Sequence, residues 1–261
     1  MAAFPPALLE SLREKCMRFE LVVLTIVSFP LAVAQEKPKN IPVSTWVRED
    51  LFAGFLDGDM ARHGQGVKKL DDVLAKNPKN AVALAWKGGN ALLFAVRAYE
   101  AGNIPGFEAE YNNALDIFAR AAEIAKQIAP AREGVLAITG GSFTVFGDRL
   151  PPKHQREAWL KVRENYSQLR ELQKAKFDGL PVHFRGEVMA GLAQAAQRLG
   201  ETEKATELTQ ELVTAFPGTP YAVFAKRWLD KPETMAKTKV ACASCHDAGR
   251  LQAALNATPR N

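Results

Sequence analysis

The chain has 261 residues, of which 47% are hydrophobic and 24% are charged. This length and composition allow one or two buried cores and exclude a disordered or collagen-like chain. The net charge is only +5, and lysine and arginine are spread among acidic residues. We therefore expect an ordinary solvated surface and no nucleic-acid partner.

Residues 1–34 have the pattern of an export signal behind an over-extended start. The run from Leu21 to Val33 is mostly apolar, and Ala32-Val33-Ala34 supplies an A-x-A cleavage site. A start at Met17 gives a compact signal, which leaves residues 1–16 as the over-extended part. The apolar run is short for a transmembrane helix. We expect a bacterial protein that is periplasmic or otherwise exported, and membrane-bound only if the signal is retained as an anchor.

Residues 35–45 form a polar, proline-containing linker, and residues 46–230 are predicted to be almost entirely helical. Alanine, leucine, glutamate, lysine, glutamine and arginine dominate the second range, and no run of alternating β-branched residues indicates a strand. Breaks between helices are predicted at Asn77-Pro78, Gly102-Asn103, Ala129-Pro130, Leu150-Pro151-Pro152, Gly179-Leu180-Pro181 and Phe216-Pro217-Gly218. Helical spacing predicts core positions at Leu84, Leu92, Phe118, Leu136, Trp159, Leu192, Leu208 and Leu212.

The segment Gly186–Pro217 resembles a tetratricopeptide repeat. Ala193 stands where the first helix of such a repeat packs closely on the second, Gly200-Glu201 stands at the turn, and Ala205 stands at the next close contact. Pro217 matches the residue that ends the repeat. This is the clearest unit of an internal repeat that we trace upstream.

Small residues upstream carry the same register. Gly54 and Gly88 are 34 positions apart, which matches the period of this repeat. Gly88 and Gly140 are 52 positions apart, so we expect lengthened helices or inserted turns in the middle units. The resemblance implies an all-α, tetratricopeptide-like helical-hairpin solenoid over residues 46–230, with a concave face that binds protein partners. A non-repeating helical bundle is the alternative.

Near the C-terminus, Cys242-Ala243-Ser244-Cys245-His246 match C-x-x-C-H, the attachment pattern of a c-type haem. Two thiols at this spacing add to the haem vinyl groups, and the adjacent histidine reaches the iron. Cys16 lies outside the predicted mature chain, which leaves Cys242 and Cys245 as its only thiols. A disulfide or redox pair and a zinc site remain alternatives.

Residues 231–261 are therefore predicted to be a haem attachment segment, and Val240 to Leu251 resemble the corresponding part of cytochromes c. The resemblance implies one covalently bound haem c, with thioether bonds to Cys242 and Cys245 and with His246 as the proximal iron ligand. The chain lacks the downstream methionine ligand of that family. We predict His183 or Met235 as the distal ligand, ahead of Met60, His63, His154 and Met189, while a neighbouring chain is a further source.

These features predict an exported monohaem c-type cytochrome on a helical-repeat scaffold. Its expected task is electron transfer, with the repeats docking a redox partner protein or another haem protein, or with copies of the chain forming a homo-oligomer. A scaffold with a structural or sensory haem, and a haem enzyme with an open iron site, are the alternatives. No catalytic side chain is predicted, because the chain lacks P-loop, zincin and nucleophile-elbow motifs.

Overall fold

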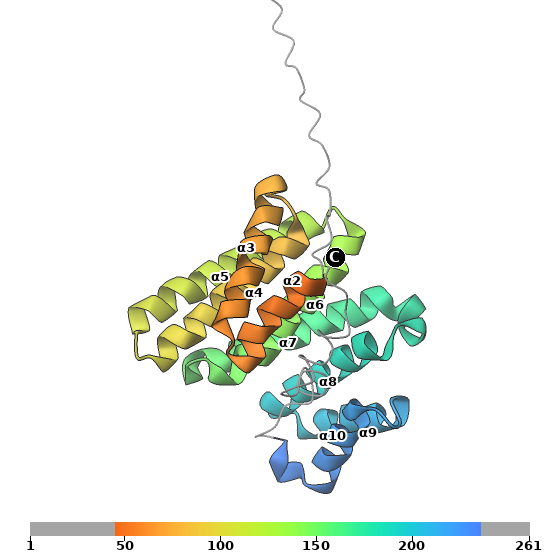
Figure 1. The fold of residues 1–261 in the computed structure, drawn as a ribbon. Helices are drawn as coiled ribbons and strands as arrows, with labels where there is room; N and C mark the ends of the chain where they lie inside the picture. The colour runs from red at the N-terminus through yellow and green to blue at the C-terminus, as the bar shows by residue number, and fades with distance from the viewer. Residues whose placement is uncertain (1–44, 236–261) are drawn as a thin grey trace, which may run out of the picture. The chain divides into compact units, whose positions relative to one another are not determined.

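The computed structural model describes residues 45–235. Every regular element in this range is helical, so the prediction of an all-α fold is confirmed (Figure 1). The α-helices are α2 (Thr45–Phe52), α3 (Met60–Lys76), α4 (Ala81–Glu100), α5 (Ile104–Ala125), α6 (Ala129–Phe146), α7 (Pro152–Gln173), α8 (Val182–Arg198), α9 (Thr202–Ala215) and α10 (Pro220–Asp230). Short helical turns are η1 (Ala53–Asp57), η2 (Gly147–Arg149), η3 (Lys174–Gly179) and η4 (Pro232–Thr234).

Each predicted break lies at a helix boundary, because local residues stop one helix and start the next. Asn80 and Asn103 cap α4 and α5, since each side-chain oxygen accepts a hydrogen bond 3.0 Å long from the backbone N–H three residues later. Gly102 and Gly200 have positive φ angles of 75° and 82°, which end the preceding helices. The turn around Gly58, which separates η1 from α3, was not among the predicted breaks.

Consecutive helices pack as pairs joined by short turns. The pairs are α2 with α3, α4 with α5, α6 with α7, and α8 with α9, and α10 packs on α9. Neighbouring pairs are joined mainly where α4 meets α6 and where α7 meets α8. Figure 1 shows this order as a progression of colour along the helices from α2 to α10.

Small residues stand where the helices of one pair approach closely. A Cβ atom on Gly88 of α4 would lie 2.8 Å from the Phe118 ring of α5, and one on Gly140 of α6 would lie 3.1 Å from the Tyr166 ring of α7. Ala193 is fully buried on α8. Helices α4 to α7 have 20, 22, 18 and 22 residues, whereas α8 and α9 have 17 and 14.

The apolar faces of the helices meet in one large core cluster and a smaller one beside it. All of the predicted core positions are buried: Leu84, Leu92, Phe118, Leu136, Trp159, Leu192, Leu208 and Leu212. Within residues 45–235, none of the helices combines the length and the apolar character that a membrane crossing requires. The predicted start and signal, the linker up to residue 44, and residues 236–261 lie outside the described residues.

Candidate functional site

The described chain ends close to the predicted haem motif. Cys242, Cys245 and His246 lie outside the described residues, whereas Met235, seven positions before Cys242, is the last residue described. The candidate site therefore lies in the first residues of the predicted haem segment, just before the motif. We refer to it as the anchor, made up of Met235 and the side chains that hold it.

Met235 is tied to the end of α10 by its own turn. Its backbone N–H donates to the Pro232 carbonyl at 3.1 Å, and the Thr234 hydroxyl donates to the Lys231 carbonyl at 2.7 Å. The Met235 side chain is only 7% exposed and belongs to the large core cluster. The chain is therefore packed against the helices up to this point.

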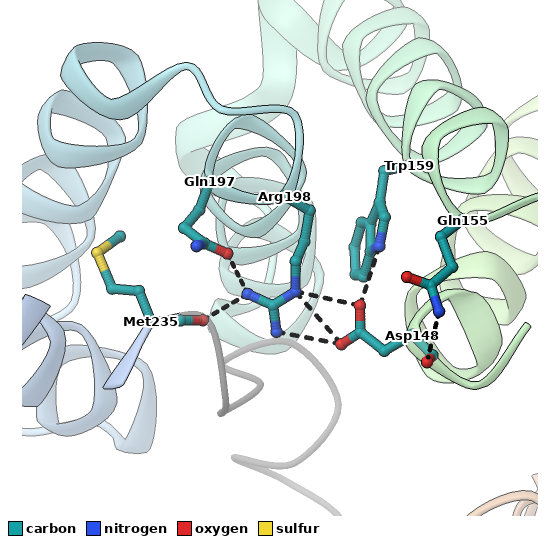
Figure 2. A network of polar contacts seen from close by, with 6 residues as sticks. All are labelled: Asp148, Gln155, Trp159, Gln197, Arg198 and Met235. Carbon is teal, nitrogen blue, oxygen red and sulfur yellow. Dashed lines mark hydrogen bonds and ion pairs between the residues drawn. The ribbon is translucent and has the colours of Figure 1, made fainter. Parts of the chain in front are cut away.

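Arg198 connects Met235 to the rest of the anchor. It occupies the last turn of α8, where a cation is favoured by the helix dipole. Its Nη1 donates to the Met235 carbonyl and to Gln197 Oε1 (Figure 2). On its other side, Nε and Nη2 donate to the two carboxylate oxygens of Asp148, each at 3.1 Å. Such two-point pairing of arginine with a carboxylate is strong and directional.

Asp148 lies in η2 and connects Arg198 to residues of α7. Its Oδ1 accepts a hydrogen bond of 3.0 Å from the Trp159 indole N–H, and the Arg198 guanidinium lies 5.6 Å from the Trp159 ring centroid. Gln155 donates to the backbone carbonyls of Asp148 and Leu150 at 3.2 and 2.8 Å. Figure 2 shows that one arginine thereby joins the turn between α6 and α7, the end of α8 and the start of the C-terminal segment.

The predicted distal ligand His183 lies in the first turn of α8, and its side chain is 48% exposed. Its Nε2 is 3.6 Å from the Glu187 carboxyl, and its Nδ1 is 3.4 Å from the Tyr221 hydroxyl. Burial raises the pKa of Glu187, although His183 and a hydrogen bond from Tyr166 act in the opposite direction. His183 is therefore accessible, with a polar group near each ring nitrogen.

The other residues considered as distal ligands are more enclosed. His63 is 1% exposed and Met189 is 2% exposed, so both are core residues. His154 lies in the first turn of α7, and its ring centroid is 4.6 Å from that of Tyr111 and 5.3 Å from that of Phe107. Met60 is partly buried.

Among the described residues, no group of three or more histidine, cysteine, aspartate or glutamate side chains could hold a metal ion. The structure places His183 and Met235 at separate points, His183 in the first turn of α8 and Met235 beside Arg198 at the last. Each remains a prediction, since Cys242, Cys245 and His246 of the predicted haem motif lie outside the described residues.

Sequence reasoning did not identify Arg198 and Asp148, which are 50 positions apart. The only local signal at Arg198 is that it is a cation in the last helical turn before Gly200, a position that favours positive charge. This signal does not indicate which residue Arg198 contacts. Asp148 stands in a turn ahead of two prolines, where an acidic residue is unremarkable.

Comparisons with protein-family models, with curated proteins and with solved structures find no match to this chain. Function is therefore inferred from its own residues.

Proposed function

We propose that this protein is an exported monohaem c-type cytochrome that transfers electrons and docks its partners through a helical-repeat scaffold. The C-x-x-C-H sequence from Cys242 to His246 is the observation that carries the proposal. The helices of residues 45–230 would supply the scaffold, and the anchor holds Met235, seven residues before Cys242.

The donor set of the chain fits this prosthetic group. Cys242 and Cys245 would form the thioether bonds, and His246 would be the proximal ligand. His183 is the preferred distal ligand among the described residues, because its half-exposed imidazole can be reached without opening the core. Met235 is the second choice, since its side chain would first have to leave the core cluster. The bound haem would supply an iron that gains and loses one electron.

The close contacts within helix pairs favour a tetratricopeptide-like solenoid as the scaffold. A Cβ atom on Gly54 would lie 2.6 Å from His63, so small residues at 54, 88 and 140 each face the second helix of their own pair. The hairpin of α8 and α9 also spans the segment that resembles one repeat. Such repeats stack into extended surfaces on which redox partner proteins, other haem proteins or further copies of the chain can dock.

Export is proposed from the signal-like pattern of residues 1–34 and from the haem motif itself. Both point to the same compartment, because bacterial c-type haem attachment takes place outside the cytoplasmic membrane. The periplasm is therefore the proposed location.

A haem stain after denaturing electrophoresis tests the proposal. Co-expression of the full chain with a c-type maturation system should give a stained band, because thioether bonds survive denaturation. The double variant Cys242→Ser/Cys245→Ser should lose the stain, whereas Cys16→Ser, which lies in the predicted removed segment, should keep it. An unstained wild-type band, with maturation proven on a control cytochrome, would refute haem attachment.

The reduced spectrum then separates electron transfer from the alternative functions. Six-coordinate, low-spin iron that does not react with carbon monoxide is expected for an electron carrier with a distal protein ligand. High-spin iron that binds carbon monoxide would contradict electron transfer as the main task. It would instead favour a gas sensor or a haem enzyme with an open iron site.

A further inference from the structure

A cavity of about 200 Å3 lies between α6, α7 and α8, and no anchor residue lines it. Its apolar wall includes Ala137 of α6, Leu169 of α7, and Phe184 and Val188 of α8. Leu169 and Val188 are 3% and 2% exposed, whereas Phe184 is 48% exposed. The cavity therefore reaches from the core of the protein to its surface beside Phe184.

The polar side chains that line the cavity on α6 and at the end of α7 are Glu133 and Gln173. Gln173 donates through Nε2 to Glu133 at 2.9 Å, and Lys176 Nζ donates to the other oxygen of Glu133 at 2.7 Å. The Gln173 Oε1 atom is buried, so an occupant of the cavity cannot reach it. This part of the wall therefore does not call for a polar ligand.

Tyr166 and Glu187 supply the remaining polar groups of the wall. The Tyr166 hydroxyl donates to Glu187 Oε1 at 3.0 Å, which uses the only hydrogen that this hydroxyl can donate. The other carboxyl oxygen of Glu187 lies 3.6 Å from His183 Nε2. The polar groups of the wall thus have their partners inside the protein, and what the cavity offers an occupant is apolar surface.

The space stays open because the Tyr166 ring cannot shift into it. The ring is fully buried, and added Cβ atoms on Gly140 of α6 and Gly191 of α8 would meet its opposite edges, at Cε1 and at Cε2. The hydrogen bond to Glu187 holds the ring at a third point. Side chains around an empty space lose dispersion contacts, so a molecule that fills the space is favoured.

We propose that this cavity binds a small apolar molecule, an aromatic hydrocarbon with a single ring. The size agrees, since an apolar protein cavity of about 150 Å3 takes up benzene. Two rings of the wall, those of Tyr166 and Phe184, can pack edge-to-face against an aromatic occupant. Leu169 and Val188 add aliphatic contacts, whose burial favours an apolar ligand.

A free molecule fits this cavity better than a side chain of a partner protein does. Glu133 and Glu187 are the charged residues of the wall, and their side chains are 28% and 22% exposed. They therefore extend toward solvent, where the backbone carbonyls of a partner would face carboxyl oxygens. A free hydrocarbon has no polar group to desolvate and avoids this cost.

Calorimetric titration of the full chain with toluene tests the site. A single toluene should bind each chain, and saturating toluene should move the midpoint of urea unfolding to higher urea, because toluene binds the folded chain. A titration without saturable binding would overturn the proposal. N-acetylphenylalanine amide carries the same ring on a peptide backbone and should bind more weakly than toluene. Tighter binding of the amide would assign the cavity to a partner's side chain and overturn the free molecule as its occupant.

Matched alanine variants locate the binding. Ala137→Leu should weaken toluene binding by at least about tenfold, because the larger side chain occupies the cavity. Ala137→Val should cause a smaller loss, and it decides the question if circular dichroism shows that the leucine variant is misfolded. Ala109→Leu makes the same change at an exposed position of α5 that does not line the cavity, so it should leave the affinity unchanged. Equal affinities in Ala137→Leu and Ala109→Leu would refute the site, and none of these measurements requires haem attachment.

Discussion

His63 illustrates how much a single side chain depends on its surroundings. It is 1% exposed, its ring centroid lies 5.8 Å from that of Phe55 and 6.0 Å from that of Phe94, and its Nε2 has no hydrogen-bond partner. Burial, with Arg97 as a smaller cause, lowers the pKa of His63 from its ordinary value of 6.5. The fold therefore disfavours the protonated form of this imidazole.

The stability of the protein should consequently fall as His63 is protonated. On acidification the unfolded chain binds this proton first, because the pKa of His63 is lower in the folded chain. The free energy of unfolding then falls with decreasing pH below about 6.5, by at most about 1.4 kcal/mol per pH unit from this residue. Urea unfolding of the wild type and of His63→Phe between pH 7 and pH 5 measures how the free energy of unfolding depends on pH.

The His63→Phe variant keeps a ring in the same aromatic surroundings but cannot titrate. Its free energy of unfolding should therefore decrease less between pH 7 and pH 5 than that of the wild type does. Parallel pH profiles for the two proteins would contradict the burial of a neutral histidine at this position.

At the scale of the elements, the approach of α7 to α8 depends on a missing side chain. A Cβ atom on Gly191 would lie 2.1 Å from Cε2 of the Tyr166 ring, and Tyr166 is fully buried. The ring is also held by its hydrogen bond to Glu187. Neither helix has room for even one methyl group here, and interiors packed at this density transmit such strain.

We expect Gly191→Ala to destabilise the protein by about 3 kcal/mol, because the ring must move within a filled core. Gly64→Ala on α3 is the matched control, since nothing lies within 4 Å of a Cβ at this helical position. It should stabilise the protein by up to about 1 kcal/mol through helix propensity alone. Urea unfolding measures the free energy of unfolding of both variants. Equal changes in the two would argue against the close contact between α7 and α8.

At the scale of the whole described chain, the Arg198–Asp148 pair joins parts that are distant in sequence. The side chain of Arg198 is 10% exposed and that of Asp148 is 30% exposed, so the pair is largely withdrawn from water. The nearby pair between Arg149 and Glu100 has the same two-point geometry, with side chains 37% and 44% exposed. The two pairs share the turn η2, and they differ in burial and in the further hydrogen bonds that Arg198 makes to Gln197 and to the Met235 carbonyl.

Arg198→Ala should lower the free energy of unfolding by about 3 kcal/mol, because Asp148 and the Met235 carbonyl lose a buried donor. Arg149→Ala should lower the free energy of unfolding by no more than about 1 kcal/mol, because exposed ion pairs contribute little to stability. Hydrogen exchange at residues 232–235 should speed up in Arg198→Ala and not in Arg149→Ala. Unchanged exchange there would show that Arg198 does not hold the start of the C-terminal segment.

Much of the fold was predictable because helix formation is governed by nearby residues. Pro78, Gly102 and Pro217 ended helices as expected, since a fixed or positive φ acts within one turn of the chain. The core leucines were also predictable, because burial follows helical spacing. The ring contacts of His154 were not predictable, since the rings that pack on it come from α5, which no local pattern links to α7.

The sequence by itself determined that residues 45–235 are helical, where most of their helices end, and that the chain carries a C-x-x-C-H motif, because each depends on residues a few positions apart. Only the tertiary structure decided that Arg198 meets Asp148 and Met235, and that Gln173 and Glu187 line one cavity. Those contacts join different helices, and the packing of all the intervening side chains determines which residues meet.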